Sequence, residues 1–302
     1  MNFLRFVGRH AGIVMLGGMV VVAFLPGVST MLRPFLPVLV SLVLGLAIAR
    51  LDLGAILGEL GNGRSVAGLF ALLIVFGPLT CLGMVWLGQI FGASSETLLA
   101  LAVFGASPPL SSAANLALLL GYNARITLKF GLLATVALPF LGPFSLGLVG
   151  VQADIAPVVM AQQIALMIAG GIFIGLALQV AIGKSKISVN SEAFNGVAAL
   201  AMILFLFPLF DGVGGFVIAK PMQAFGLLCL ALLLNFGGHV AVAFAARRVT
   251  DPDTASALGM MFGNRNVSFF LAVLPANPAL GLFIAASQIP IYSTPAIFGR
   301  RR

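Results

Sequence analysis

The sequence has little charge: 8% of its 302 residues are charged, whereas 61% are hydrophobic. A soluble domain carries roughly 25% charged residues, so this shortage excludes a soluble protein and indicates an integral membrane protein in a lipid bilayer. The net charge of +8 does not indicate nucleic-acid binding. The basic residues cluster at the ends of apolar runs and form no stripe interleaved with aromatic residues.

Groups that carry chemistry are also scarce. The two cysteines, Cys81 and Cys229, lie in apolar runs, where we expect packing residues rather than a disulfide or a metal pair. No Walker A, His-Glu-x-x-His or Cys-x-x-Cys pattern occurs, so we expect no ATP-driven motor, metal or cofactor in this chain. A membrane hydrolase would need an acid beside its nucleophile and base, and no apolar run contains one. We therefore expect no enzyme.

What the sequence does contain is a series of apolar runs of about 20 residues, the length that crosses a bilayer. They predict one polytopic membrane domain over 1–302, with repeats of about 1–151 and 152–302. The first run follows Arg5 and Arg9, so a cleaved signal peptide is the alternative interpretation of that run. We place ten membrane-spanning helices near 11–25, 34–50, 66–91, 97–121, 125–149, 158–182, 193–210, 221–246, 254–276 and 279–298.

The basic residues predict the orientation of these spans. If the N-terminus is cytoplasmic, 13 of the 16 Lys and Arg residues lie inside, Arg33 and Lys220 lie outside, and Arg265 lies within a span. The excess of positive charge on cytoplasmic segments then predicts that both termini are cytoplasmic, in the cell membrane (the inner membrane, for a bacterium). Because five spans is an odd number, the two halves form an inverted repeat.

Two of the spans are interrupted by polar residues, at matching places in the two halves. Tandem Pro108-Pro109 cannot continue a regular helix, and Gly263 tolerates the non-helical angles that a break needs. Paired interruptions of this kind indicate a transporter site near the midplane. We expect the helices to restart with a side-chain cap, from Ser111 or Ser112 in the fourth span, and from Asn264, Asn266 or Ser268 in the ninth.

Arg265 stands about halfway across the ninth span, where a charge costs about 2.5–3.5 kcal/mol even on the insertion scale. All eight acids lie at span ends or in loops, namely Asp52, Glu59, Glu96, Asp154, Glu192, Asp211, Asp251 and Asp253. Arg265 must therefore use backbone carbonyls, amides such as Asn115 and Gln288, or a ligand. Together with the positive ends of two restarted helices, it predicts a site for an anion, formed by Ser111, Ser112, Asn115, Asn264, Arg265, Asn266 and Gln288.

Other polar residues within the spans have alternative interpretations. Gln288, Thr135, Ser287 and Thr294 are of the type that commonly joins neighbouring helices in membrane bundles. His239 is the histidine within a span; we expect a packing residue, and a titrating group is the alternative. We expect Lys129 to extend to the cytoplasmic surface, and the mouth of a cavity is the alternative.

At these residues the sequence resembles the bile acid:sodium symporter family and its relatives with the same ten-helix inverted-repeat fold. The resemblance covers the whole length in span pattern. It rests on Pro-x-x-x-x-x-Asn from Pro109 to Asn115 and on Gly-x-x-Asn from Gly263 to Asn266. It implies an all-α fold of panel helices 1, 2, 6 and 7 and core helices 3–5 and 8–10. The broken helices 4 and 9 would cross at the midplane, and an organic anion would bind beside them.

The sequence departs from this family at the sodium site. The resemblance implies a glutamate and a glutamine that help to hold sodium, at the positions of Met261 and Arg265, and commonly a serine at the position of Ala114. What remains of the ion site is Asn115, Thr135, Met261 and Arg265. We expect the Arg265 guanidinium to occupy or overlap the sodium position, and transport to be independent of sodium or coupled differently.

The sequence thus predicts a secondary transporter that moves a small organic anion, bile-acid-like or a short carboxylate, by alternating access. The alternatives are a passive anion channel or facilitator with Arg265 as its selectivity element, and a receptor that transports nothing. A cation/proton antiporter would need a buried acid within a span. The identity of the substrate, the direction of transport and the choice between monomer and homodimer stay open.

Overall fold

The computed structural model describes residues 2–51, 63–150 and 156–298. Within these ranges every regular element is a helix, and the strand-like pairing is a single isolated bridge between Pro109 and Arg265. The chain is therefore all-α. The helices before residue 151 are α1 (Asn2–Arg9), α2 (Ala11–Ala23), α3 (Pro26–Leu32), the 3-10 helix η1 (Arg33–Phe35), α4 (Leu36–Ile48), α6 (Gly63–Ile90), α7 (Ser95–Ala106), α8 (Ala113–Leu120) and α9 (Ala124–Leu148).

The second half of the chain also contains both long and short helices. Its membrane-length segments include one that contains a π-helical turn, so that α14, η2 and α15 run on from one another. The helices are α10 (Pro157–Ile182), α11 (Lys184–Val189), α12 (Ser191–Leu209), α13 (Val213–Ala219), α14 (Pro221–Leu232), η2 (Leu233–Gly237), α15 (Gly238–Ala246), α16 (Pro252–Gly263), α17 (Ser268–Val273) and α18 (Pro278–Phe298).

Six helical segments of the described chain are long and apolar enough to cross a membrane, and the bent pair α1 and α2 would make a seventh. The chain is thus a multi-pass membrane protein. The expected spans 97–121 and 254–276 contain α7 with α8 and α16 with α17, whose pieces are each 12 residues or shorter. The six segments are Pro26–Ile48, Val66–Ile90, Ala124–Leu148, Pro157–Ile182, Ser191–Leu209 and Pro221–Ala246.

The N-terminal region differs from the prediction in two ways. The axes of α1 and α2 make an angle of 90°, and α1 packs against α12. The second apolar segment begins at Pro26 rather than near residue 34. Proline is favoured at the first position of a helix, because its missing N–H and fixed φ cost nothing there. Pro26 therefore begins α3, which continues through η1 into α4.

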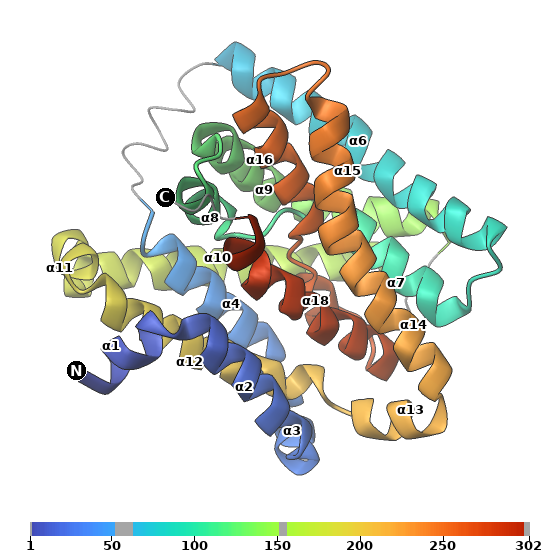
Figure 1. Ribbon diagram of the computed structural model, residues 1–302, viewed down its shortest axis with the longest axis horizontal. Coiled ribbons are helices and arrows are strands. Elements are labelled where there is room, and N and C mark those ends of the chain that lie inside the picture. The colour runs from blue at the N-terminus through green and yellow to red at the C-terminus, as the bar shows by residue number, and fades with distance from the viewer. Residues whose placement is uncertain (1, 52–62, 151–155, 299–302) are drawn as a thin grey trace.

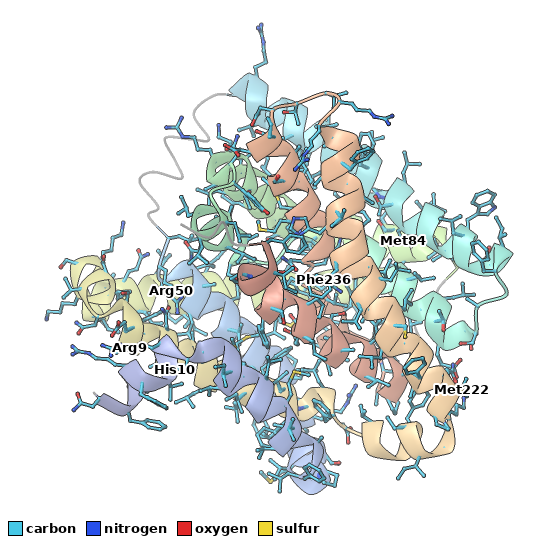
Figure 2. The ribbon with its side chains drawn as sticks, viewed as in Figure 1. Arg9, His10, Arg50, Met84, Met222 and Phe236 are labelled. Atoms are coloured by element: carbon cyan, nitrogen blue, oxygen red, sulfur yellow. The ribbon has the colours of Figure 1, made fainter. Side chains whose placement is uncertain are left out.

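Apolar side chains cover much of the outer surface. Phe91 is 83% exposed, Trp86 is 63% exposed and Met222 is 81% exposed; Met222 projects outward from α14 in Figure 2. A soluble monomer rarely exposes large contiguous apolar patches, so this surface fits the hydrocarbon of a bilayer.

The helices pack as two groups. In the first group α4 lies against α10, and α12 contacts α1, α2 and α4. In the second group α6 contacts α7 and α9, α15 contacts α16, and α18 contacts α7 and α14. Figure 1 shows α1, α2, α4 and α12 at the lower left, and α6, α7, α15 and α16 above and to the right. The two groups meet where α9 contacts α10, α4 contacts α17 and α12 contacts α18.

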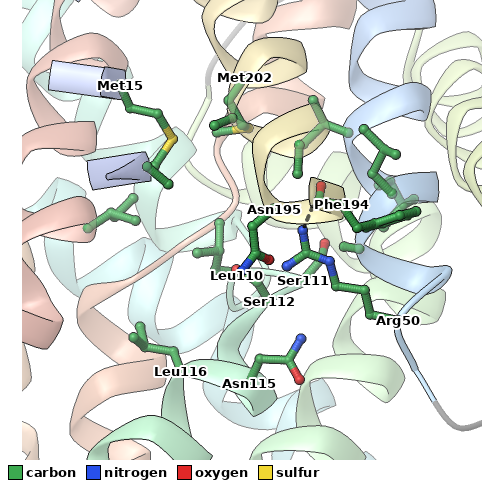
Figure 3. A pocket seen from close by; sticks show the side chains of 18 of the residues that line it. Met15, Arg50, Leu110, Ser111, Ser112, Asn115, Leu116, Phe194, Asn195 and Met202 are labelled. Carbon is green, nitrogen blue, oxygen red and sulfur yellow. Dashed lines mark hydrogen bonds between the residues drawn. The ribbon is translucent and has the colours of Figure 1, made fainter. Parts of the chain in front are cut away.

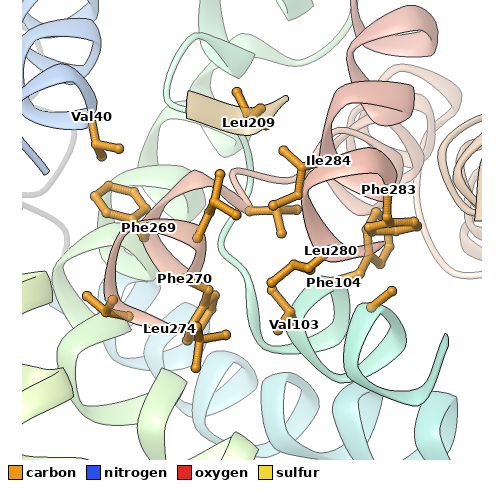
Figure 4. Packing of buried hydrophobic residues seen from close by; sticks show 14 of the residues in the cluster. Val40, Val103, Phe104, Leu209, Phe269, Phe270, Leu274, Leu280, Phe283 and Ile284 are labelled. Carbon is orange, nitrogen blue, oxygen red and sulfur yellow. The ribbon is translucent and has the colours of Figure 1, made fainter. Parts of the chain in front are cut away.

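Buried apolar side chains fill the seam between the two groups. Val40 of α4 and Leu209 of α12 belong to the same buried cluster as Phe269 and Phe270 of α17 and Phe283 of α18; Figure 4 shows Val40 beside Phe269 on one side of this cluster and Phe283 on the other. Burial of a large apolar side chain contributes about 1.5–3 kcal/mol in water, but the lipid outside a membrane protein is apolar too. Close packing rather than water exclusion therefore joins the groups within the membrane.

Candidate anion-binding site at the junction of two broken helices

Both predicted interruptions are present, and they pair with each other. The N–H of Leu110 donates to the carbonyl of Asn264 at 2.8 Å, and the N–H of Asn266 donates to the carbonyl of Pro108 at 2.8 Å. Pro109 lies opposite Arg265 in this short antiparallel bridge. The pairing satisfies backbone groups that a broken helix leaves without partners. We call residues 107–112 and 264–267 the junction.

Arg265 is held at the junction by backbone carbonyls. Its Nη1 donates to the carbonyls of Gly105 at 3.0 Å and Ser107 at 2.8 Å, and its Nε donates to the carbonyl of Phe262 at 3.1 Å. The guanidinium carbon also lies 5.5 Å from the ring centre of Phe104 and 4.9 Å from that of Phe262. Of the partners that the sequence left open, the structure thus selects the carbonyls; the Asn115 and Gln288 amides are not among them.

These carbonyls belong to the ends of α7 and α16, the two helices that precede the breaks. The last carbonyls of a helix lack partners within the helix and carry its negative partial charge. A guanidinium that binds the carbonyl ends of two helices compensates both partial charges. The sequence predicted that Arg265 would add to the positive ends of the restarted helices, but part of its charge is matched by the helices before the breaks.

The predicted side-chain caps of the restarted helices are wrong. Ser112 precedes α8 with ψ near 6°, and Val267 precedes α17 with ψ near −14°; neither helix has a side-chain capping bond. A capping residue needs an extended backbone to direct its oxygen at the helix, and neither residue has one. The polar side chains link the two interruptions instead. Asn266 Nδ2 donates to Ser111 Oγ at 3.2 Å, and the Ser268 hydroxyl donates to Asn266 Oδ1.

A cavity of about 870 Å³ lies beside the junction, between the two helix groups. Its walls come from α2, α4 and α12 on one side and from α8, α18 and the junction on the other; Figure 3 shows several of these side chains. Asn264 is buried and is not among the residues that line the cavity. The structure therefore brings six of the seven predicted binding residues together at one cavity: Ser111, Ser112, Asn115, Arg265, Asn266 and Gln288.

The four residues expected to remain from an ion site do not all lie at the cavity. Asn115 and Arg265 line the cavity, whereas Met261 is buried in the core at 3% exposure. Thr135 is also buried, and its hydroxyl donates to the carbonyl of Gly131 at 2.8 Å, within its own helix. Two of the four residues are therefore away from the cavity.

The polar residues of α18 were expected to join neighbouring helices, and this interpretation is wrong. Each binds a carbonyl of its own helix, four residues earlier: Ser287 binds Phe283, Gln288 binds Ile284 and Thr294 binds Pro290. Hydroxyls in helices commonly bind this carbonyl. Thr135 does the same with Gly131.

Several polar residues of the cavity were not predicted from the sequence. Arg50 and Lys184 line it, as do Asn195 and Tyr292, and Tyr292 Oη is buried without a hydrogen-bond partner among the described residues. Arg50 and Lys184 stand at helix ends, where the sequence marked them only as orientation signals. With Arg265, three cations line the cavity, and the described lining includes no acid.

The acids of the described chain stand at helix ends, as the sequence predicted. Three of them form ion pairs: Glu192 with Arg9 at 3.0 Å, Asp211 with Arg33 at 3.8 Å, and Glu96 with Lys220 at 2.9 Å. Asp251 caps the start of α16, which contains Asp253 in its first turn. Asp52, Glu59 and Asp154 lie outside the described residues. Within the described ranges, no group of three His, Cys, Asp or Glu residues could hold a metal ion.

The remaining candidates lie away from the cavity. His239 is 4% exposed, and its ring centre lies 4.3 Å from that of Phe298 and 6.2 Å from that of Tyr122, as expected of a packing residue. Lys129, in α9, is half-buried and does not line the cavity. Cys81 is buried and Cys229 is exposed, and neither forms a disulfide.

Neither the protein-family models nor the curated proteins with which the sequence was compared match this chain. The resemblance to the bile acid:sodium symporter family therefore rests on the span pattern and on the two motifs at the junction.

Proposed function

We propose that this protein is a secondary transporter that moves a small organic anion across a membrane by alternating access. One observation carries the proposal: a cavity of about 870 Å³ is lined by three cations and, among the described residues, by no acid. Most ligand sites have volumes of about 300–1,000 Å³, so the cavity has the size for a small organic solute. Its positive lining favours a negatively charged one.

Alternating access needs two bodies that can rock against each other around a central site. We propose that the α4, α10 and α12 group acts as the panel and the group with α7, α9, α16 and α18 acts as the core, in a ten-span inverted repeat. The contacts between the groups support this division, because the cavity lies between them. If the N-terminus is cytoplasmic, the cavity residues of α4, α8 and α18 all belong to cytoplasmic halves of spans. The cavity then lies in the cytoplasmic half of the membrane.

Arg265 supports transport that is independent of sodium. A sodium ion in a protein is held by oxygen atoms, and here the carbonyl oxygens of Gly105, Ser107 and Phe262 are instead bound by a guanidinium. The tethered cation cannot leave with the substrate, so its presence couples nothing to an ion gradient. In this proposal Arg265 performs the structural work of the sodium ion that the family resemblance implies, and Met261 stands where a charged ligand would otherwise be.

The test is counterflow in proteoliposomes loaded with unlabelled cholate, lactate or pyruvate, one acid of each candidate class. We expect at least one labelled acid to accumulate transiently against its gradient, at the same rate with and without a sodium gradient. A channel would equilibrate the label without accumulation. Accumulation that requires sodium would contradict the role of Arg265, and the absence of uptake for all three acids would contradict the transporter.

A double variant tests whether Arg265 has replaced a sodium ion. Met261→Glu with Arg265→Gln restores the two side chains that the family resemblance implies at the sodium site. We expect sodium to stabilise this variant against thermal unfolding and to leave the wild-type protein unchanged. Potassium at the same concentration is the matched control. Equal effects of both salts on both proteins would contradict the assignment of a former sodium site.

A further inference from the structure

The cavity holds two arginines that differ in their capacity to bind a ligand. A guanidinium binds a carboxylate most strongly through two neighbouring nitrogens, as a fork. In Arg265, Nε donates to one carbonyl and Nη1 donates to two. Either fork of the guanidinium would need Nε or Nη1, so neither is free for a carboxylate.

Arg50 is held much more loosely. Its one hydrogen bond to a described residue runs from Nη2 to the carbonyl of Phe194 at 3.3 Å, at the long end of the range. Its guanidinium lies 5.2 Å from the ring centre of Phe194, and the residue as a whole is exposed. Figure 3 shows it directed into the cavity, on the side of Asn195 and Ser111. We call Arg50, Phe194 and Asn195 the Arg50 wall.

The surroundings of Arg50 suit a bound anion. Asn195, Ser111 and Ser112 also line the cavity, and each has a hydrogen-bond donor. Arg50 and Asn195 come from the first helix group, and the two serines come from the second. An anion between them would touch both groups at once, which is what a substrate must do if its binding is to alter how the groups sit together.

We infer that Arg50 is the side chain that binds the charged group of the transported anion, and that Arg265 is not. On binding, the carboxylate would replace the Phe194 carbonyl as the partner of the guanidinium, and the cation stacked on the Phe194 ring would stay in place. This inference rests on the proposed function, because it assumes that the cavity takes an organic anion.

The test compares each acid with its uncharged methyl ester. Stabilisation against thermal unfolding is titrated for cholate, lactate and pyruvate and for the methyl ester of each, in wild-type protein and in Arg50→Gln. We expect about 10- to 100-fold weaker binding of the acid by the variant, since a hydrogen bond to a charged group contributes about that factor. Binding of the ester should stay within about twofold. A purely structural role of Arg50 would weaken acid and ester alike.

Arg247→Gln is the matched control, because Arg247 is an exposed cation that does not line the cavity. It removes the same charge and should leave both ligands unaffected. If both variants bind the acid equally weakly, net charge explains the effect and the inference is overturned. Unchanged acid binding by Arg50→Gln would also overturn it. If none of the three acids stabilises the wild-type protein, the proposed function itself fails, and the inference about Arg50 fails with it.

Discussion

The junction and the Arg50 wall each contain an arginine, and the two arginines lie in different environments of one cavity. At the junction, Arg265 makes three hydrogen bonds of 2.8–3.1 Å to carbonyls and lies against two phenylalanine rings. At the Arg50 wall, one bond of 3.3 Å and one ring of the described residues hold the guanidinium. The carbonyls at the helix ends decide the difference. The ends of α7 and α16 supply carbonyls to Arg265, whereas at the end of α4, beside Arg50, the Gln179 amide donates to the carbonyls of Ile48, Ala49 and Leu51.

The largest expected effect is the loss of Arg265. Arg265→Gln removes the charge and at least one of the three bonds, and it leaves buried carbonyls at the junction without partners. We expect a loss of about 3–5 kcal/mol in the free energy of unfolding, measured by thermal unfolding in detergent. Arg265→Lys keeps the charge but lacks the planar fork. Its free energy of unfolding should lie between those of the wild-type protein and Arg265→Gln. Unchanged stability of Arg265→Gln would contradict the structural role.

The second comparison uses glycines to measure the free space beside each region. A Cβ on Gly263 would lie 2.2 Å from the carbonyl oxygen of Asn235, which is backbone and cannot swing away. Gly263→Ala should therefore cost about 1–3 kcal/mol of stability through overpacking. A Cβ on Gly12, in the cavity wall, meets its nearest atom at 3.9 Å. Gly12→Ala should be neutral or stabilise α2 by about 0.5–1 kcal/mol. Equal losses of stability in Gly263→Ala and Gly12→Ala would contradict this difference in free space.

A smaller effect on stability is expected from the Arg50 wall. Among the described residues, Arg50→Gln loses one long hydrogen bond at an exposed position, so its unfolding free energy should change by about 1 kcal/mol or less. The same variant should bind acids far more weakly. Arg265→Gln should show the reverse order of effects, with stability as the first loss. A thermal unfolding series on the two variants without ligand separates these outcomes, and a large loss in Arg50→Gln would remove the distinction.

The smallest effect lies far from both regions, at the ion pair of Glu96 and Lys220. Their contact at 2.9 Å, with further hydrogen bonds from the backbone of Glu96 and the side chains of Gln223 and Ser95, lowers the pKa of the Glu96 carboxyl to about 2. Because that pKa is depressed, the stability from this pair is present above the ordinary value near 4.5 and is lost as pH falls towards 2. At the surface the pair contributes about 1 kcal/mol or less. Lys220→Met should lose this part of the pH dependence between about pH 6 and about pH 3.

The junction itself should add little to that acid sensitivity, because the partners of Arg265 are neutral carbonyls. Thermal unfolding of wild type, Lys220→Met and Arg265→Gln at the two pH values checks this. Lys220→Met should make the free energy of unfolding depend less on pH. Arg265→Gln should lower that free energy by the same amount at about pH 6 and at about pH 3. An acid-sensitive contribution that disappears with Arg265 would mean that a carboxylate takes part at the junction.

Much of the candidate site could be predicted because it depends on local rules. Pro108 and Pro109 cannot continue a helix, and Gly263 permits a break, so both interruptions are visible along the chain. The capping residues could not be predicted, because Ser111 and Asn266 bind each other across 155 residues instead of capping their own helices. Arg50 was missed for a related reason. At the end of an apolar run, an arginine has the same sequence pattern whether it faces lipid headgroups or a cavity.

Three properties can be read from the amino-acid sequence alone: the chain is a helical membrane protein, two of its helices break at Pro108-Pro109 and near Gly263, and Arg265 has no acid within its span. Composition and backbone chemistry act over a few residues, so these properties can be read along the chain. The packing of the helices is needed to show that Arg265 binds carbonyls at the ends of α7 and α16, one of them 160 residues away, and that Arg50 lines the same cavity. Those facts depend on which helices pack together, and side-chain chemistry at one position does not specify its distant neighbours.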